Sequence, residues 1–80
     1  MPSLELYFKP TCPYCFKVLN YLEHEGISVS KIDTSASLEQ KQKLIEIGGK
    51  SQVPCLVIDG KALYESDDII EWFQSNYERE

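Results

Sequence analysis

The sequence predicts a small α/β domain in which a four-stranded mixed sheet is covered by helices on both faces. Three patterns carry this prediction: a strand, a helix and a second strand at the start, a β-prone run that turns back at Asp59-Gly60, and a closing amphipathic helix. The first three elements form a βαβ unit with parallel strands, and the turn adds two antiparallel strands to the same sheet. The expected order is therefore β-α-β-α-β-β-α.

Length and composition limit the classes of protein to which the chain can belong. Its 80 residues, 42% hydrophobic and 26% charged, suit one domain over residues 1–80 with one modest core. The opening segment has no basic leader and no run approaches the ~18 apolar residues of a membrane span, so we expect a cytoplasmic monomer that does not bind membranes. The net charge of -5 repels phosphate backbones and argues against nucleic acid as a partner.

The first half of the sequence alternates strand and helix. Leu4–Phe8 is a short apolar-rich run that a loop at Pro10 follows, which indicates a strand. Apolar residues then recur at helical spacing over Pro13–Glu25, with proline at the first helical position and Gly26 at the stop. Residues 27–32 alternate apolar and polar side chains, as a half-buried strand does.

The second half begins with a helix and a hairpin. Ser37 and Gln40 have the spacing of a capping box, and the helix that they start is expected to end at Gly48-Gly49. Residues 53–58 and 62–64 are β-prone and flank a two-residue turn that favours antiparallel pairing.

A last helix follows the hairpin. Ser66 can cap it, and Asp67 and Asp68 lie where negative charge interacts favourably with the helix dipole. Its apolar face is expected to contain Ile69, Ile70, Phe73 and Tyr77.

The Cys12-Pro13-Tyr14-Cys15 sequence lies at the junction between the first strand and the first helix. The sulfur of Cys12 can there lie beside unpaired backbone N–H groups, and a helix start with the nearby charge of Lys9 can lower a thiol pKa from ~8.5 to between roughly 3.5 and 7.5. Cys15 follows one helical turn later, close enough to attack a mixed disulfide on Cys12. Pro13 fixes the backbone, and Tyr14 puts a flat amphipathic surface beside the sulfur. We therefore predict that Cys12 attacks and Cys15 resolves.

Structural roles for the cysteines are weaker interpretations. A zinc site needs about four ligands, and the only further cysteine and histidine are Cys55 and His24, so we expect no metal. A disulfide that closes so short a loop would constrain the unfolded chain very little. Cys55 is interpreted as core filling, with a redox role as the alternative, and His24 as a surface residue.

The chain resembles the glutaredoxins through K-P-T-C-P-Y-C at residues 9–15, Q-V-P at 52–54 and S-D at 66–67. The resemblance covers nearly the whole chain and implies a thioredoxin-like fold. It also implies an enzyme that reduces protein disulfides and glutathione mixed disulfides, with Cys12 as nucleophile and Cys15 as resolving thiol. The implied partners are glutathione, as a co-substrate and not a tightly bound cofactor, and disulfide-containing or glutathionylated proteins.

The same resemblance implies how glutathione binds. Pro54 would be cis, leaving the Val53 backbone free to pair with the peptide as an added strand. The γ-glutamyl carboxylate would meet the N–H groups of Ser66 and Asp67, and the Asp67 side chain would take its ammonium. The glycyl carboxylate would face Lys9 and, as a further candidate, Gln42. Each has a simpler alternative: Ser66 as a helix cap, Lys9 as solvated surface, and Pro54 as a strand start. The implied glutathione-binding residues are Lys9, Tyr14, Gln42, Val53, Pro54, Ser66 and Asp67.

One departure from the glutaredoxin pattern keeps other functions open. Many glutaredoxins have two glycines where this chain has Tyr64-Glu65, and the Glu65-Ser66 pair is closer to the glutathione-binding domain of glutathione transferases. This feature suggests a glutathione-binding module without turnover as one alternative. An iron-sulfur carrier, with a cluster shared by two chains through Cys12 and glutathione, is a second alternative, and Pro13 argues against it because proline stiffens the loop.

Overall fold

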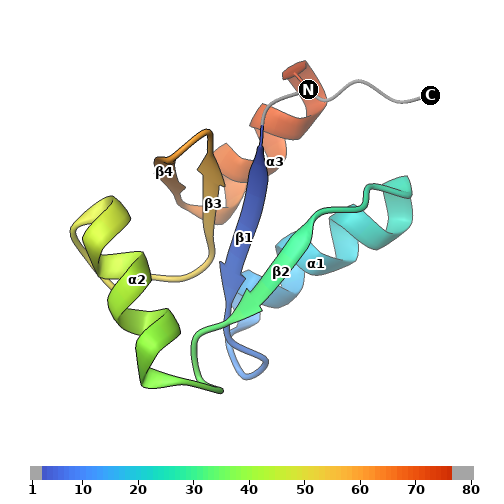
Figure 1. The fold of residues 1–80 in the computed structure, drawn as a ribbon. Coiled ribbons are helices and arrows are strands. Elements are labelled where there is room, and N and C mark those ends of the chain that lie inside the picture. The colour runs from blue at the N-terminus through green and yellow to red at the C-terminus, as the bar shows by residue number, and fades with distance from the viewer. Residues whose placement is uncertain (1–2, 77–80) are drawn as a thin grey trace.

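The computed structural model describes residues 3–76, which follow the order β-α-β-α-β-β-α (Figure 1). The strands are β1 (Leu4–Phe8), β2 (Ser30–Asp33), β3 (Cys55–Ile58) and β4 (Lys61–Tyr64). They form one sheet in the order β2-β1-β3-β4, in which β1 and β2 are parallel and the other two pairs are antiparallel. The predicted element order and mixed four-stranded sheet are confirmed.

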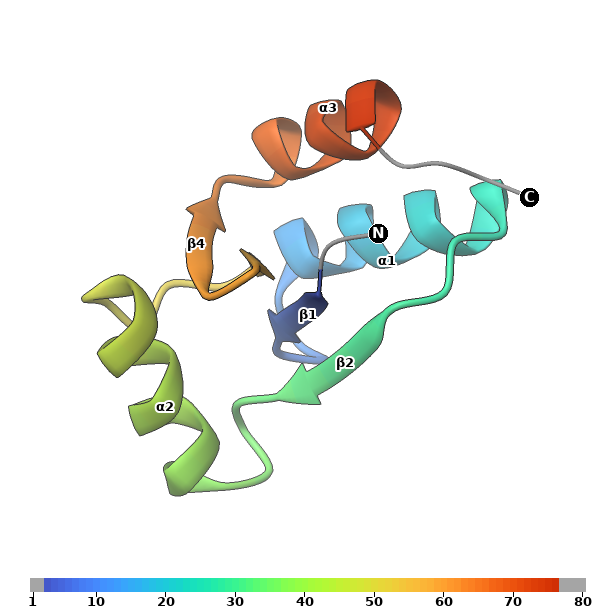
Figure 2. The same cartoon turned by 45° about the horizontal axis from the view of Figure 1, so that its top comes forward.

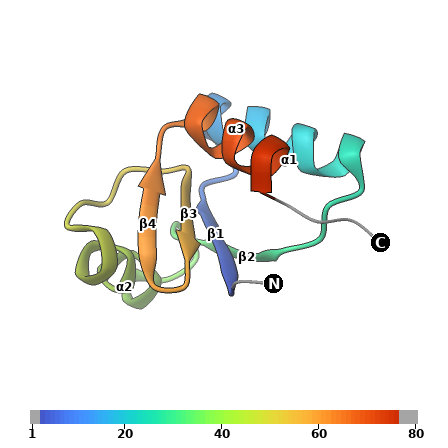
Figure 3. The ribbon, with the colours of Figure 1, turned by 90° about the horizontal axis from the view of Figure 1, so that it is seen from above.

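Helices cover both faces of this sheet. Figures 2 and 3 show α1 (Pro13–Glu25) and α3 (Ser66–Asn76) together on one face, and α2 (Leu38–Gly48) on the other. Among residues 3–76, no helix is long and apolar enough to cross a membrane.

The alternation of side chains along the strands divides the interior into two cores. Leu6 and its cross-strand partner Leu56 face α1 and α3, whereas the adjacent pair Tyr7 and Cys55 faces α2. Cys55 and Leu56 therefore face opposite sides of the sheet. The core under α1 and α3 contains Leu6, Val18, Leu22, Ile27, Leu56, Ile69 and Phe73. The core under α2 contains Tyr7, Leu44, Cys55 and Val57.

The second strand starts later than the sequence predicts, at Ser30 and not at residue 27. Gly26 ends α1 in the left-handed conformation with φ 68°, and the N–H of Ile27 donates to the carbonyl of Leu22 at 2.9 Å. This is the hydrogen-bonding pattern of a Schellman cap, in which the residue after the glycine packs back on the helix. Ile27 is therefore buried as part of the helix end, and its apolar side chain does not indicate a strand.

The hairpin has the predicted turn and different strand bounds. Asp59 and Gly60 both have positive φ, 49° and 84°, as a two-residue type I′ turn requires. The first strand begins at Cys55 and not at residue 53, because Pro54 has no N–H to donate to a ladder. The second includes Lys61, which pairs with Ile58 across the turn.

Two helix starts differ from each other in how they are capped. Ser37 caps α2 as expected, accepting a hydrogen bond from the N–H of Glu39 at 3.2 Å. The prediction that Ser66 caps the last helix is wrong, because α3 already includes Ser66 and the carbonyl of Glu65 accepts from the N–H of Ile69 at 3.0 Å. Glu65 therefore has the cap position, with φ 73°. Tyr77, expected on the apolar face of this helix, lies outside the described residues.

Candidate active site

The candidate nucleophile lies where the chain leaves β1 and enters α1. Cys12 is the N-cap residue, with extended backbone angles, and Pro13 follows at the first helical position. A turn in which the N–H of Cys12 donates to the carbonyl of Lys9 at 3.2 Å brings the sulfur back to the helix start. The first turn of α1 contains no acidic residue that would oppose a thiolate.

The surroundings of Cys12 stabilise its thiolate. Burial acts to raise the pKa of Cys12, but hydrogen bonds from the Cys15 backbone and thiol, a backbone hydrogen bond from Tyr14 and the charge of Lys9 lower it below the ordinary value. The Cys15 N–H lies 3.4 Å from Cys12 Sγ. Of the two thiols at the start of α1, Cys12 therefore has the one whose ionised form is favoured, as the helix-start position predicts.

Cys15 has the opposite environment. It is fully buried, and burial, together with the neighbouring Cys12 sulfur, raises the pKa of its thiol to about 12 although the N–H of Lys9 donates to its sulfur at 3.4 Å. A thiol of this kind stays protonated near neutral pH. The pKa values of the two thiols are thus shifted in opposite directions within one helical turn, and all three cysteines of the chain are free.

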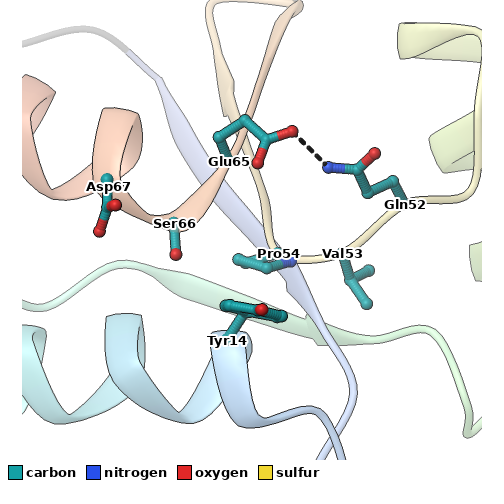
Figure 4. Close-up of a pocket in the computed structure, with 7 residues that line it drawn as sticks. All are labelled: Tyr14, Gln52, Val53, Pro54, Glu65, Ser66 and Asp67. Atoms are coloured by element: carbon teal, nitrogen blue, oxygen red, sulfur yellow. Dashed lines mark hydrogen bonds between the residues drawn. The ribbon is translucent and has the colours of Figure 1, made fainter.

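A pocket of about 400 Å³ lies between the starts of α1 and α3 and the segment before β3 (Figure 4). One of its lining residues, Val53, is next to Cys12. Five of the nine residues predicted for the site line it together. They are Tyr14, Val53, Pro54, Ser66 and Asp67.

The segment before β3 brings its backbone to Cys12. The Val53-Pro54 peptide bond is cis, as the resemblance implies, and Cys12 Sγ lies 3.9 Å from the carbonyl oxygen of Val53. Tyr14, with 65% of its surface exposed, lies beneath Pro54 in Figure 4. The pocket therefore has an exposed aromatic side chain on one side and, on another, a backbone segment next to the sulfur of Cys12.

Lys9 and Gln42, the two residues expected near a glycyl carboxylate, do not line this pocket. Lys9 is half-buried before α1, where its charge acts on Cys12. Gln42 is exposed on α2, on the opposite face of the sheet from α1 and α3.

The structure adds three residues that sequence reasoning did not assign to the site. Gln52 and Glu65 line the pocket and are joined by a hydrogen bond of 3.1 Å from Gln52 Nε2 to Glu65 Oε1. Lys17, on α1, forms an ion pair with Asp67. Gln52 and Glu65 adjoin recognisable motifs and could have been found there, whereas no local pattern connects Lys17 with Asp67.

The remaining candidates lie away from the pocket. Cys55 is fully buried against α2, and burial raises the pKa of its thiol to about 11. His24 is exposed near the end of α1 and lies 3.1 Å from the carboxylate of Glu25. In the described part of the chain, no three His, Cys, Asp or Glu side chains gather as metal ligands would.

The chain is similar to glutathione S-transferase N-terminal domains and to glutaredoxins. The sequence model of the glutathione S-transferase N-terminal domain matches residues 6–80. Glutaredoxin 3 of Escherichia coli K12 is 29% identical over 69 residues, covering 86% of this chain and 83% of that protein. Glutaredoxin 1 of Rickettsia prowazekii is 34% identical over 69 residues, covering 84% and 73%. The crystal structure of the holo form of glutaredoxin C1 from Populus tremula x tremuloides has a TM-score of 0.71 at 26% identity, over 92% of this chain and 76% of that one.

Proposed function

The chain belongs to the glutaredoxin family, which shares its fold with glutathione S-transferase N-terminal domains, and on that premise we propose that it is a glutathione-dependent thiol-disulfide oxidoreductase. The observation that carries the proposal is the pair of unlike thiols at the start of α1. Cys12 has a lowered pKa, and Cys15, buried behind it, has a raised one. Cys12 is therefore suited to attack the substrate disulfide, and Cys15 to react in the second step.

With a glutathionylated protein, the Cys12 thiolate attacks the glutathione sulfur. The bond between the protein sulfur and glutathione breaks, a bond between Cys12 and glutathione forms, and the protein thiolate leaves and takes up a proton. A second glutathione thiolate then attacks the bound glutathione sulfur, releasing oxidised glutathione and restoring the Cys12 thiolate. Each turnover therefore oxidises one glutathione thiol and reduces one protein sulfur, because the sulfur of the first glutathione is already part of a disulfide in the substrate.

With a protein disulfide, Cys15 completes the reaction. Cys12 forms a mixed disulfide with the protein, Cys15 loses its proton to the leaving thiolate and attacks Cys12, and the protein leaves as a dithiol. The mixed disulfide removes the negative charge of Cys12, which is one of the causes that keep the pKa of Cys15 high. Formation of the intermediate therefore lowers the pKa of Cys15 when its thiolate is needed. Two glutathione molecules reduce the resulting disulfide.

The pocket beside Cys12 is the proposed glutathione site. Tyr14, Val53, Pro54, Ser66 and Asp67 would contact the γ-glutamyl-cysteinyl part, with backbone N–H groups at the start of α3 facing its carboxylate. Lys9 and Gln42 remain the proposed partners of the glycyl carboxylate. We further propose that the chain works as one domain in a reducing, cytoplasmic compartment, on glutathionylated or disulfide-containing proteins.

Glutathione-coupled turnover of the wild type beside three single cysteine variants tests this proposal. Cys12→Ser should lose turnover of both a small glutathione mixed disulfide and a protein disulfide. Cys15→Ser should retain the first reaction and lose the second, and Cys55→Ser, the matched control, should retain both. Full-rate turnover by Cys12→Ser would exclude the proposed nucleophile.

A glutathione-binding domain without turnover is the second candidate, favoured by the Glu65-Ser66 pair and by the transferase domain model. The two candidates differ in the Cys12 pKa. Alkylation of Cys12 that titrates near the value of free cysteine, together with glutathione binding and no turnover, would favour the binding domain.

A further inference from the structure

Asp67 lines the pocket, yet its carboxylate is already paired with a cation. Its partner is the Nζ of Lys17 on α1, a residue that does not line the pocket. Lys17 lines a separate groove between α1 and α3, together with Tyr21 and Ile70. The ion pair therefore joins the pocket to the α1–α3 groove.

The two carboxylates that line the pocket at the start of α3, those of Glu65 and Asp67, have different partners. In Figure 4 the Glu65 side chain points towards Gln52, whereas Ser66 and Asp67 point towards α1. Glu65 accepts from a neutral amide and Asp67 is paired with a full positive charge. Of the residues 3–76 that line the pocket, two are carboxylates and none is a lysine or arginine. Lys17 is thus the cation that partly neutralises this end of the pocket from outside it.

We propose that Lys17 sets the affinity and selectivity of the pocket for a ligand ammonium, because Lys17 and the ammonium compete for the same Asp67 carboxylate. The inference rests on the proposed glutathione function, in which the γ-glutamyl ammonium approaches Asp67. Binding then exchanges one cation for another on the same carboxylate. A ligand whose amino-acid end carries both a carboxylate and an ammonium can bind in this way. A ligand without the ammonium leaves the Lys17–Asp67 pair in place.

The exchange of Lys17 for the ligand ammonium should change the binding affinity only modestly. The side chains of Lys17 and Asp67 are 52% and 81% exposed, and an exposed ion pair is worth between nothing and about 1 kcal/mol, or at most about a fivefold change in an equilibrium constant. Removal of the competing charge should therefore strengthen glutathione binding about two- to fivefold. The effect should fall at high salt, because salt screens exposed charges.

The test compares Lys17→Met, which keeps the apolar stem, with Lys17→Arg, which keeps the charge, and with Lys43→Met. Lys43 is exposed on α2, so its loss changes the net charge equally, away from the pocket. The probes are glutathione and an analogue in which the γ-glutamyl group lacks its amino group. Binding is measured by calorimetry, and KM and kcat by glutathione-coupled turnover.

Lys17→Met should lower the Kd and KM for glutathione about two- to fivefold, leave kcat unchanged, and leave the Kd for the analogue unchanged. Lys17→Arg and Lys43→Met should match the wild type, and the effect of Lys17→Met should vanish in an Asp67→Asn background. A raised KM in Lys17→Met, or equal changes for both probes, would overturn the inference while glutathione turnover by the wild type still upheld the proposed function. Failure of the wild type to bind or turn over glutathione would instead remove the proposed function, and the inference with it.

Discussion

Cys15 and Cys55 are both fully buried, on opposite faces of the same sheet, and burial raises the pKa of their thiols to about 12 and about 11. Cys15 lies on α1, beside the sulfur of Cys12, whereas Cys55 lies in the core under α2 with the aromatic side chains of Tyr7 and Tyr64. Burial makes both thiols inert by default. Cys15 differs from Cys55 because it has a neighbouring sulfur, that of Cys12, with which it can form a disulfide. A role in the reaction is therefore proposed for Cys15, whereas Cys55 fills a core.

The two cores around these thiols also differ in composition. The core under α1 and α3 is built from aliphatic side chains and one phenylalanine, and the site is at its edge. The core under α2 contains a tyrosine and a cysteine, with Tyr64 packed against it. The core under α2 therefore contains polar groups, and none of its residues has a proposed role in the reaction, so variants within this core should change stability and leave turnover intact.

The largest expected contrast is in alkylation of the native protein. At pH 7 a thiol with a pKa of about 11 is ionised in roughly one molecule in ten thousand, whereas an ordinary thiol is ionised in a few per cent. Because the pKa of Cys12 is lowered further, Cys55 should react with iodoacetamide more than roughly 10²-fold more slowly than Cys12. Cys15 should be slower still, because the pKa of its thiol is raised to about 12. Peptide mapping by mass spectrometry at successive times gives the three rates, and Cys12→Ser should show no fast thiol. Labelling of Cys55 at the rate of Cys12 would mean that burial does not protect it.

Gly48→Ala should destabilise the α2 side by about 1 to 2 kcal/mol. A Cβ at Gly48 would lie 1.9 Å from the Tyr64 Oη and 2.9 Å from the Ala62 Cβ, so Tyr64 would have to move. That movement would break the hydrogen bond of 3.0 Å from Tyr64 Oη to the carbonyl of Lys50. The gain of alanine over glycine in a helix, up to about 1 kcal/mol, offsets only part of the cost of overpacking, about 1 to 3 kcal/mol.

Urea unfolding of Gly48→Ala measures this cost, and the same substitution in a Tyr64→Phe background shows its source. Without the Tyr64 hydroxyl the closest contact is gone, so Gly48→Ala should cost less there than in the wild type. Equal costs in both backgrounds would mean that the clash with Oη is not responsible.

Tyr7→Phe should stabilise the protein by about 1 kcal/mol. The Tyr7 hydroxyl is buried and has no hydrogen-bond partner in the described part of the chain, and burial raises its pKa. A buried polar group without a partner costs about 1 to 3 kcal/mol, part of which the small void left by the hydroxyl would offset. The urea midpoint should rise with an unchanged slope, and a fall in the midpoint would show that the hydroxyl has a stabilising contact.

The sequence predicts the parts of this molecule that local rules control. The helix start at Pro13, the turn at Asp59-Gly60 and the order of the elements follow from residues within a few positions of one another. The predicted start of β2 at residue 27 is wrong because the apolar side chain of Ile27 suits a strand and a helix end equally well. The Lys17–Asp67 ion pair joins positions 50 residues apart, and neither periodicity nor spacing contains that information.

The smallest effect should come from Lys9 and Lys50, two lysines that each act on the pKa of one thiol, on opposite sides of the sheet. The charge of Lys9 lowers the pKa of Cys12, and the charge of Lys50 lowers that of Cys55, in each case as the weakest of several causes. Lys9→Gln should therefore raise the Cys12 pKa slightly, so that alkylation of Cys12 loses rate below its pKa and regains it above. Lys50→Gln should leave the pH profile of alkylation unchanged, because the only thiol it influences is buried. A shift of the profile by Lys50→Gln and none by Lys9→Gln would contradict this expectation. It would mean that the pKa of the reactive thiol depends on charge on the α2 side of the sheet and not on charge at the start of α1.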